Sequence, residues 1–123
     1  MCMSNLNTLG IDIGSTTVKI AILDGNNHIL FADYQRHFAN IQETLAQLLK
    51  KARESLGAMD VIPAITGSGG LTLSKHLDVP FIQEVVAVAG ALQDYAPQTD
   101  VAIELGGEDA KIIYFTGGID QRM

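Results

Sequence analysis

Polar and apolar residues alternate in the first third of the chain, and this pattern predicts three β-strands. We expect the strands at residues 8–13, 18–23 and 28–34. The segments between them, 14–16 and 24–27, contain Gly, Ser, Asp and Asn, which are typical of tight turns. The domain is therefore expected to open with three antiparallel strands.

Apolar residues recur at helical spacing from residue 41, which predicts a long helix. Asn40 stands where it can cap the start of this helix, and Gly57 where it can end it. The remaining elements are expected in the order strand, helix, helix, strand and strand, at 60–66, 71–77, 83–95, 100–105 and 111–115. This order is typical of an α/β domain with helices packed on a mixed sheet, which we expect to contain five or more strands.

Composition narrows the possible functions. The chain has 123 residues, the size of one domain, with 47% hydrophobic and 18% charged residues, as in folded globular proteins. A net charge of −6 argues against a general nucleic-acid or anionic-membrane surface, because both need clustered Lys and Arg. No apolar run is long enough to span a bilayer, so we expect no membrane contact and a cytoplasmic location. The single cysteine, Cys2, cannot form an internal disulfide or a cysteine-ligated metal cluster within this chain.

The first turn carries candidate phosphate-binding chemistry. Asp12 ends the first strand, Gly14 follows in the turn, and Ser15, Thr16 and Thr17 supply hydroxyl groups. Glycine lets backbone N–H groups curl around an anion, and a carboxylate at a strand end can hold hydrated Mg²⁺ against phosphate. Taken alone, the same residues also suit an ordinary hairpin turn.

A second segment with the same layout strengthens the nucleotide interpretation. Glu104 ends a strand, Gly106 and Gly107 follow, and a further strand leads away. If the two turns face one nucleotide, Asp12 and Glu104 converge on its phosphates, where one organises Mg²⁺ through water and the other orients the attacking water. We therefore predict Asp12 and Glu104 as catalytic and metal-binding residues.

Other residues leave two readings open. Lys19 and Lys111 either approach phosphate or point into solvent. The loop 67–70 lacks the spacing of a P-loop or a Rossmann turn, and it is either a tight turn or a donor of helix N–H groups to an anion. The three histidines show no ligand spacing and are expected to be surface or partly buried residues, at positions 28, 37 and 76.

Three segments together resemble a known family. They are Leu9–Lys19 (LGIDIGSTTVK), Thr66–Gly69 (TGSG) and Glu104–Lys111 (ELGGEDAK). In this order they are similar to the activators of 2-hydroxyacyl-CoA dehydratases and to the ATPase subunits of benzoyl-CoA reductase. The C-terminal segment 118–123 looks most like the long relatives known as CoA-substrate-specific enzyme activases.

The resemblance implies an actin-like, ribonuclease H-like ATPase fold, of which residues 1–123 form the N-terminal lobe. It implies ATP or ADP and Mg²⁺ as cofactors, and a homodimer with a bridging 4Fe-4S cluster that passes a low-potential electron to a dehydratase or reductase partner. By position, Asp12, Gly14 to Thr16 and Lys19 match the first phosphate motif. The second phosphate motif is matched by Glu104, Gly106 and Gly107.

The chain also departs from the family pattern. Glu104 and Glu108 stand where most activators have Asp and Gln, which changes the reach and charge of the second motif. The cluster-binding cysteines of the family come after this motif, so no cluster ligand is expected within these residues. Because the tail after the last predicted strand leads to no further element, we expect the chain to be part of a longer protein.

Two other functions remain open. A small-molecule kinase of the sugar-kinase type shares the implied fold, although no sugar-binding loop is evident here. A non-catalytic nucleotide-binding or interaction lobe is the third hypothesis. For the 123 residues alone we expect weak or no ATP hydrolysis, with ATPase activity belonging to the parent protein.

Overall fold

The computed structural model describes residues 6–105, 110–115 and 119–122, with side chains described for residues 6–103. The chain divides into two compact units, residues 1–81 and 82–123, where its length had predicted one core. The assignment of 1–123 to one N-terminal lobe stays a prediction.

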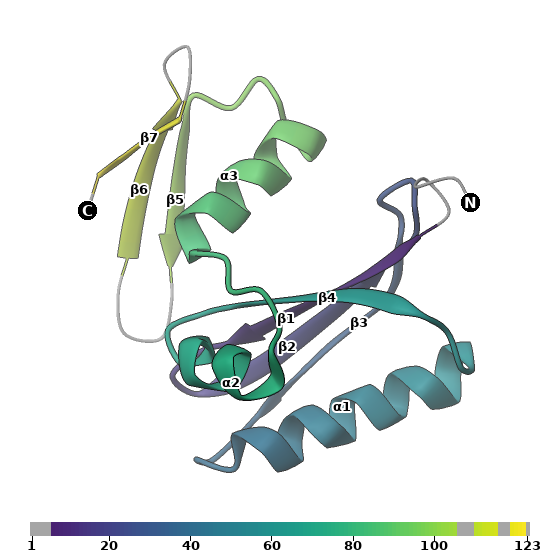
Figure 1. Cartoon of the computed structure of the whole chain (residues 1–123). Coiled ribbons are helices and arrows are strands. Elements are labelled where there is room, and N and C mark those ends of the chain that lie inside the picture. The colour runs from purple at the N-terminus through teal and green to yellow at the C-terminus, as the bar shows by residue number, and fades with distance from the viewer. Residues whose placement is uncertain (1–5, 106–109, 116–118, 123) are drawn as a thin grey trace. The chain divides into compact units, whose positions relative to one another are not determined.

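The first unit is built on a four-stranded mixed sheet with the strand order β3-β2-β1-β4 (Figure 1). Its strands are β1 (Asn7–Ile13), β2 (Thr17–Leu23), β3 (Ile29–Arg36) and β4 (Val61–Thr66). The first three are joined by antiparallel pairing, as predicted, while β4 lies parallel to β1. The carboxyl ends of β1 and β4 therefore meet at one edge of the sheet.

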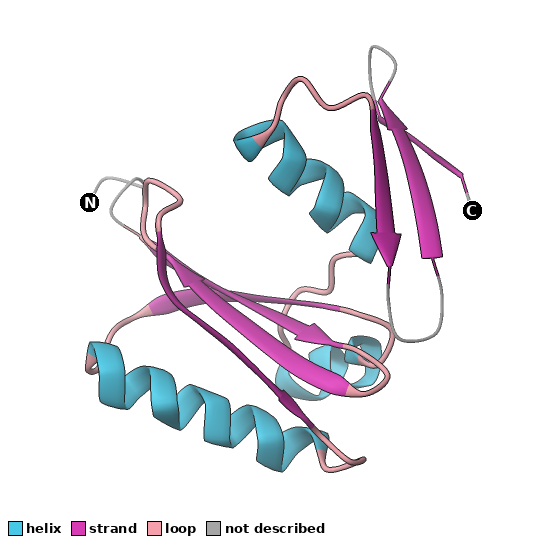
Figure 2. Ribbon diagram, turned by 180° about the vertical axis from the view of Figure 1, so that it is seen from behind, coloured by secondary structure: helices cyan, strands magenta, loops and turns pink. Residues whose placement is uncertain are grey.

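One face of this sheet carries the hydrophobic core. Alternate residues of β1 and β2 are buried there, including Ile13 and Val18, neither of which has exposed surface. Helices α1 (Ile41–Leu56) and α2 (Gly70–Leu77) lie on the same side of the sheet (Figure 2) and contribute Leu48 and Leu73 to the core cluster. The opposite face carries the polar and small residues of the same strands.

Helix α1 begins and ends close to the predicted residues. The backbone N–H of Thr44 donates to the carbonyl of Asn40, although the Asn40 side chain makes no capping bond. Gly57 ends the helix with φ +80°, and its N–H donates to the carbonyl of Arg53. Glycine suits this place because a side chain disfavours positive φ.

Strand β4 is the last strand of the first sheet. Its outer edge forms a single parallel bridge, Ile65 with Phe81, in which the Ile65 N–H donates to the Pro80 carbonyl at 2.9 Å. Residues two apart on a strand direct their N–H groups to the same side, so Pro63 lies on this edge too and has no N–H to offer a neighbour. The expected single sheet of five or more strands is instead a four-stranded and a separate three-stranded sheet.

The second unit contains helix α3 (Glu84–Tyr95) and an antiparallel sheet, β5-β6-β7. Strands β5 (Val101–Leu105) and β6 (Ala110–Phe115) form the predicted hairpin, and α3 contacts β6. The tail was expected to lead to no further element, but Ile119–Arg122 forms β7 against β6. This short segment has little apolar pattern of its own, so its pairing with β6 is what makes it a strand.

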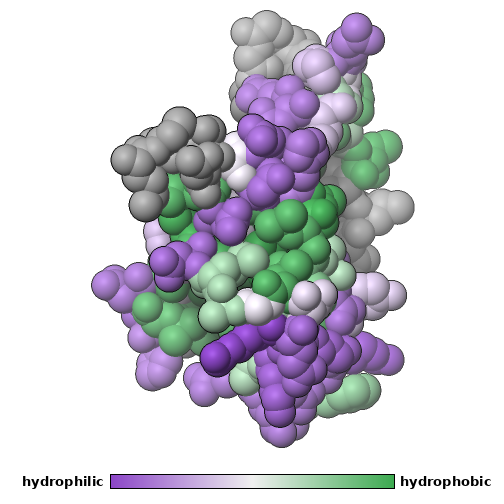
Figure 3. Space-filling view, turned by 90° about the vertical axis from the view of Figure 1, so that its right-hand side faces the viewer, coloured by the Kyte–Doolittle hydropathy of each residue, from purple (hydrophilic) through white to green (hydrophobic). Residues whose placement is uncertain are grey.

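The surface is mixed in character. Figure 3 shows apolar side chains exposed among polar ones on one face of the molecule. Large exposed apolar side chains occur in both units, such as Ile62 in β4 and Val86 in α3. Among the described residues, no helix combines the length and the apolar character needed to cross a membrane.

Candidate functional site

The turn between β1 and β2 lies at the carboxyl end of β1. Gly14 N–H donates to the Thr17 carbonyl at 2.9 Å, which closes the turn. Ser15 and Thr16 are exposed at its tip, while Gly14 and Thr17 are half-buried. The predicted hairpin is confirmed, and the two hydroxyl groups at its tip are open to a ligand.

Asp12 lies on the polar face of the sheet, because its neighbours Ile11 and Ile13 point into the core. Its cross-strand partners are Lys19 on β2 and Thr66 on β4. The Lys19 Nζ lies 4.0 Å from the Asp12 carboxylate, and the two side chains are 58% and 40% exposed. An ion pair this exposed contributes little stability to the fold.

Thr66 is a neighbour of Asp12 that the sequence analysis named only as part of the segment Thr66–Gly69, without a role in the site. Its hydroxyl oxygen is buried and makes no hydrogen bond within the described residues. Buried hydroxyl groups in proteins are usually paired, which makes this oxygen an exception among the described side chains. The sequence carries no signal for its burial beside Asp12, because that depends on the pairing of β1 with β4.

The loop 67–70 packs against the end of β1. Gly69 N–H donates to the Ile13 carbonyl at 2.9 Å, and Gly70 N–H donates to the Gly67 carbonyl at 3.0 Å. Gly67 has φ +99°, and a side chain there would collide with the Ile13 carbonyl and the Asp12 carboxylate. The loop is thus a tight turn that supports the site, while its use as an anion-binding helix start stays a prediction.

The second predicted motif forms a hairpin with the same register as the first. Glu104 pairs with Lys111 across β5 and β6, as Asp12 pairs with Lys19 across β1 and β2. The last cross-strand pair of each hairpin, Ile13 with Val18 and Leu105 with Ala110, encloses four residues. The two motifs therefore share backbone pairing as well as sequence.

Parts of the second motif are not described. Gly106, Gly107 and Glu108 lie outside the described residues, as does the side chain of Glu104. The two hairpins belong to different units. The convergence of Asp12 and Glu104 on one phosphate chain therefore stays a prediction.

The histidines differ from the expectation in one case. His28 is exposed and lies 3.3 Å from the carboxylate of Asp24, and His76 is exposed as well. His37 is 8% exposed and contacts the first turn. Within the described part of the chain, no group of three or more His, Cys, Asp or Glu side chains is arranged to hold a metal ion.

Asp24 and Asp33, which both lie outside the first turn, have lowered pKa values. The backbone N–H of His28 lowers the pKa of Asp24 below its ordinary value. The backbone N–H of Tyr34, followed by Lys51, lowers the pKa of Asp33 on β3. These shifts reflect local hydrogen bonds of the ionised carboxylates rather than a catalytic arrangement.

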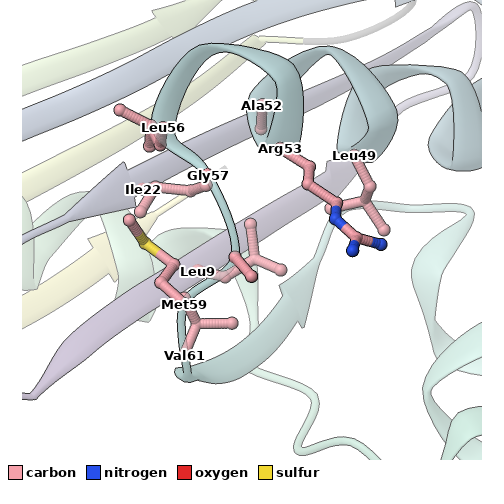
Figure 4. A pocket seen from close by; sticks show the side chains of 10 residues that line it. Leu9, Ile22, Leu49, Ala52, Arg53, Leu56, Gly57, Met59 and Val61 are labelled. Carbon is pink, nitrogen blue, oxygen red and sulfur yellow. The ribbon is translucent and has the colours of Figure 1, made fainter.

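An apolar pocket of about 360 Å³ lies between the end of α1 and the beginnings of β1 and β4 (Figure 4). Leu9, Leu56 and Met59 are among the side chains that line it, with Arg53 as the charged one. None of the predicted site residues lines this pocket. The first turn follows the last residue of β1, toward the other end of the strand.

Comparison with solved structures shows that the chain has the fold of the actin-like ATPases, and this fold defines the class of protein. More particularly, the chain is similar to the activator of the 2-hydroxyisocaproyl-CoA dehydratase from Clostridium difficile with bound ADPNP. The two are 26% identical with a TM-score of 0.79, over 93% of this chain and 43% of that one. No protein-family model matches the sequence.

Two further proteins are similar over comparable ranges. Component A of the (R)-2-hydroxyglutaryl-CoA dehydratase from Acidaminococcus fermentans is 23% identical with a TM-score of 0.72, over 93% of this chain and 44% of that one. An uncharacterized protein of Methanocaldococcus jannaschii is 29% identical over 105 residues, which is 85% of this chain and 42% of that protein. The expected resemblance to dehydratase activators is confirmed, and this chain spans less than half the length of each protein.

The fold by itself does not choose between activator and kinase. A ROK family glucokinase from Streptomyces griseus, in complex with glucose and AMPPNP, has a TM-score of 0.64 at 18% identity, over 94% of this chain and 46% of that one. At this identity the likeness concerns the fold alone. Function has to be argued from the residues of the site.

Proposed function

We propose that this chain is the nucleotide-binding part of an ATPase that activates a 2-hydroxyacyl-CoA dehydratase or a related reductase. The observation that carries the proposal is the first turn, in which Ser15 and Thr16 are exposed. This turn follows the strand that holds Asp12, whose carboxylate lies 4.0 Å from Lys19 Nζ. The similarity to a dehydratase activator with bound ADPNP supports the same assignment.

In this proposal the first turn binds phosphate. Gly14 shapes the turn, the backbone N–H groups and hydroxyls of Ser15 to Thr17 donate to phosphate oxygens, and Lys19 adds a positive charge at the same edge of the sheet. The exposed hydroxyls and the open side of the turn fit this role. Binding by several aligned donors fixes the position of the phosphate chain before hydrolysis.

Asp12 is proposed to organise Mg²⁺ through water. A partly exposed carboxylate at a strand end, opposite Thr66 in the sheet and followed by Ser15 and Thr16 in the turn, is a setting rich in oxygen-bearing residues that fits this ion. When bound, Mg²⁺ would neutralise phosphate charge. Glu104, with Gly106 and Gly107, is proposed to supply the matching second turn and to orient the attacking water.

The electron-transfer part of the proposal belongs to the whole protein. A 4Fe-4S cluster needs four ligands, normally cysteine thiolates, and the single cysteine of this chain cannot supply them. We therefore propose that the cluster, the homodimer and the dehydratase contact depend on residues outside this sequence. The cytoplasm is the proposed compartment, because Mg-ATP is an intracellular nucleotide.

The proposal is tested by titrating the isotope-labelled 123-residue chain with Mg-ADPNP and following backbone amide signals by NMR, which detects even millimolar binding. We expect the amides of residues 14–17 to shift. An Asp12→Asn variant should bind at least about tenfold more weakly, because it loses a charge-assisted contact. Asp60→Asn removes the same charge beside the start of β4 and is the matched control, expected to bind like the wild type.

Two results would contradict this assignment. Unchanged amide signals at residues 14–17 in millimolar Mg-ADPNP would exclude the turn as a phosphate site. Transfer of phosphate from ATP to a sugar hydroxyl by the protein that contains this chain would favour the kinase alternative, whose fold is the same.

A further inference from the structure

His37 occupies an unusual place at the end of β3. It is buried, although its neighbours Phe38 and Ala39 are exposed. Phe38 and Ala39 both have left-handed backbones, with φ +46° and φ +68°. Non-glycine residues adopt this conformation at a cost of about 1 kcal/mol or more each, so other contacts must hold this segment in place.

Four hydrogen bonds hold His37 itself. Its backbone N–H donates to the Thr16 carbonyl at 3.0 Å, and its own carbonyl accepts the N–H of Asn40 at 2.7 Å. The ring Nε2 lies 3.1 Å from the Gly14 carbonyl oxygen. The ring Nδ1 accepts the N–H of Ala39 at 3.0 Å.

These contacts require one form of the imidazole ring. A backbone N–H can only donate, so Nδ1 must carry a lone pair toward Ala39. A carbonyl can only accept, so Nε2 must carry the hydrogen toward Gly14. Both contacts together are satisfied by the neutral ring with its hydrogen on Nε2.

The contacts also orient the first turn. The carbonyl oxygens of Gly14 and Thr16 both point toward His37, because they accept hydrogen bonds from it. In a trans peptide the C=O and the N–H point in opposite directions, and no described peptide bond is cis. The N–H of Ser15 therefore points away from His37, and an approaching anion does not meet the Gly14 carbonyl oxygen.

We propose that His37 is a positioning residue for the phosphate-binding turn, which it acts on through the Gly14 carbonyl. This inference rests on the proposed function of the turn and adds a residue that holds the donors in place. In this role the Nε2–H group donates to the Gly14 carbonyl and so acts on the turn. The Nδ1 contact to Ala39 orients the ring.

Two conservative variants separate these contacts. His37→Gln keeps an N–H donor near the position of Nε2, whereas His37→Asn keeps an acceptor near the position of Nδ1. Each variant loses one of the two ring hydrogen bonds, so both should lower the free energy of unfolding by similar amounts. We expect His37→Gln to bind Mg-ADPNP within about threefold of the wild type, and His37→Asn to bind about five- to tenfold more weakly.

The ring is observed directly by NMR of the nucleotide-free chain labelled with ¹⁵N-histidine. We expect Nε2 to carry the hydrogen near pH 7.5, and a hydrogen on Nδ1 would overturn the inference. Equal loss of affinity in His37→Gln and His37→Asn would overturn it as well, because the role would then be structural. Failure of the wild-type chain to bind Mg-ADPNP would count against the proposed function instead, while the ring measurement would still decide whether the contact to Gly14 exists.

Discussion

At the scale of single residues, the first turn is held from two sides. His37 bonds to the carbonyls of Gly14 and Thr16, and Gly69 donates to the carbonyl of Ile13. Gly67 makes the second contact possible, since a side chain there would collide with backbone atoms that cannot move aside. Packing against the end of β1 is therefore sufficient to explain the glycine at position 67.

Three glycine-to-alanine variants test this explanation by their free energies of unfolding in urea. Gly67→Ala should lose about 2–4 kcal/mol, because it combines positive φ with a backbone collision. Gly57→Ala should lose about 1 kcal/mol, because φ is positive but the space is open. Gly90→Ala, in the interior of α3 with open space, should gain about 0.5–1 kcal/mol. Equal effects at positions 67 and 57 would show that the collision is relieved.

At the scale of elements, α1 is tied to the edge strand β3 by polar contacts as well as by the core. Lys51 Nζ lies 3.3 Å from the Asp33 carboxylate, and the Gln35 side chain donates to Gln47 at 2.7 Å. Asp33 also accepts the backbone N–H of Tyr34 at 2.8 Å. The ionised form of Asp33 is therefore favoured in the folded chain, and its pKa is lowered.

The lowered pKa of Asp33 predicts a loss of stability in acid. A carboxyl group whose pKa is lower in the folded than in the unfolded state stabilises the fold at pH values above its unfolded pKa, which is about 3.9. This stabilisation is lost as the pH falls toward and below the pKa of the folded state. Urea midpoints measured between pH 7 and pH 3 should show Asp33→Asn less stable than the wild type at pH 7, with the difference shrinking below about pH 4.

Lys51→Met is the comparison for this experiment. It keeps the Tyr34 N–H bond, the larger cause of the shift, so its pH dependence should stay close to that of the wild type. A difference between wild type and Asp33→Asn that is the same at pH 3 and pH 7 would show that ionisation of Asp33 does not contribute.

At the scale of the whole molecule, the side chains described, residues 6–103, form their hydrophobic core cluster in the first unit. This cluster lies between the four-stranded sheet and helices α1 and α2. In the described side chains of the second unit, Val85 and Ala89 are the buried apolar ones. Since burial of apolar surface is the main stabilising term, the first unit is expected to be the more stable.

Amide hydrogen exchange tests this difference. The amide hydrogens of the central strands β1 and β2 should exchange most slowly, because the opening that exposes them has the highest free energy. The amides of α3 and β6 should exchange through openings of lower free energy. The free energy of opening is measured residue by residue by NMR under native conditions. Equal protection in both units would mean that they unfold as one cooperative body.

Much of the local structure follows from the sequence because its signals are local. Alternating residues specify β1 and β2, helical spacing specifies α1, and the two glycine turns are recognisable beside Asp12 and Glu104. The resemblance of the motifs to dehydratase activators is likewise visible in the sequence, and comparison with solved structures confirms it.

Other features were decided by tertiary structure because they depend on residues far apart in the chain. The first sheet has β4 as its last strand, with a bridge to Phe81 on its outer edge, and β7 exists because β6 pairs with it. Thr66 gains its place beside Asp12 through parallel pairing, and His37 becomes buried where β3 returns to the first turn. The sequence thus determined which residues carry the candidate chemistry, while the fold decided which residues surround and orient them, since side-chain environment depends on contacts that no local pattern records.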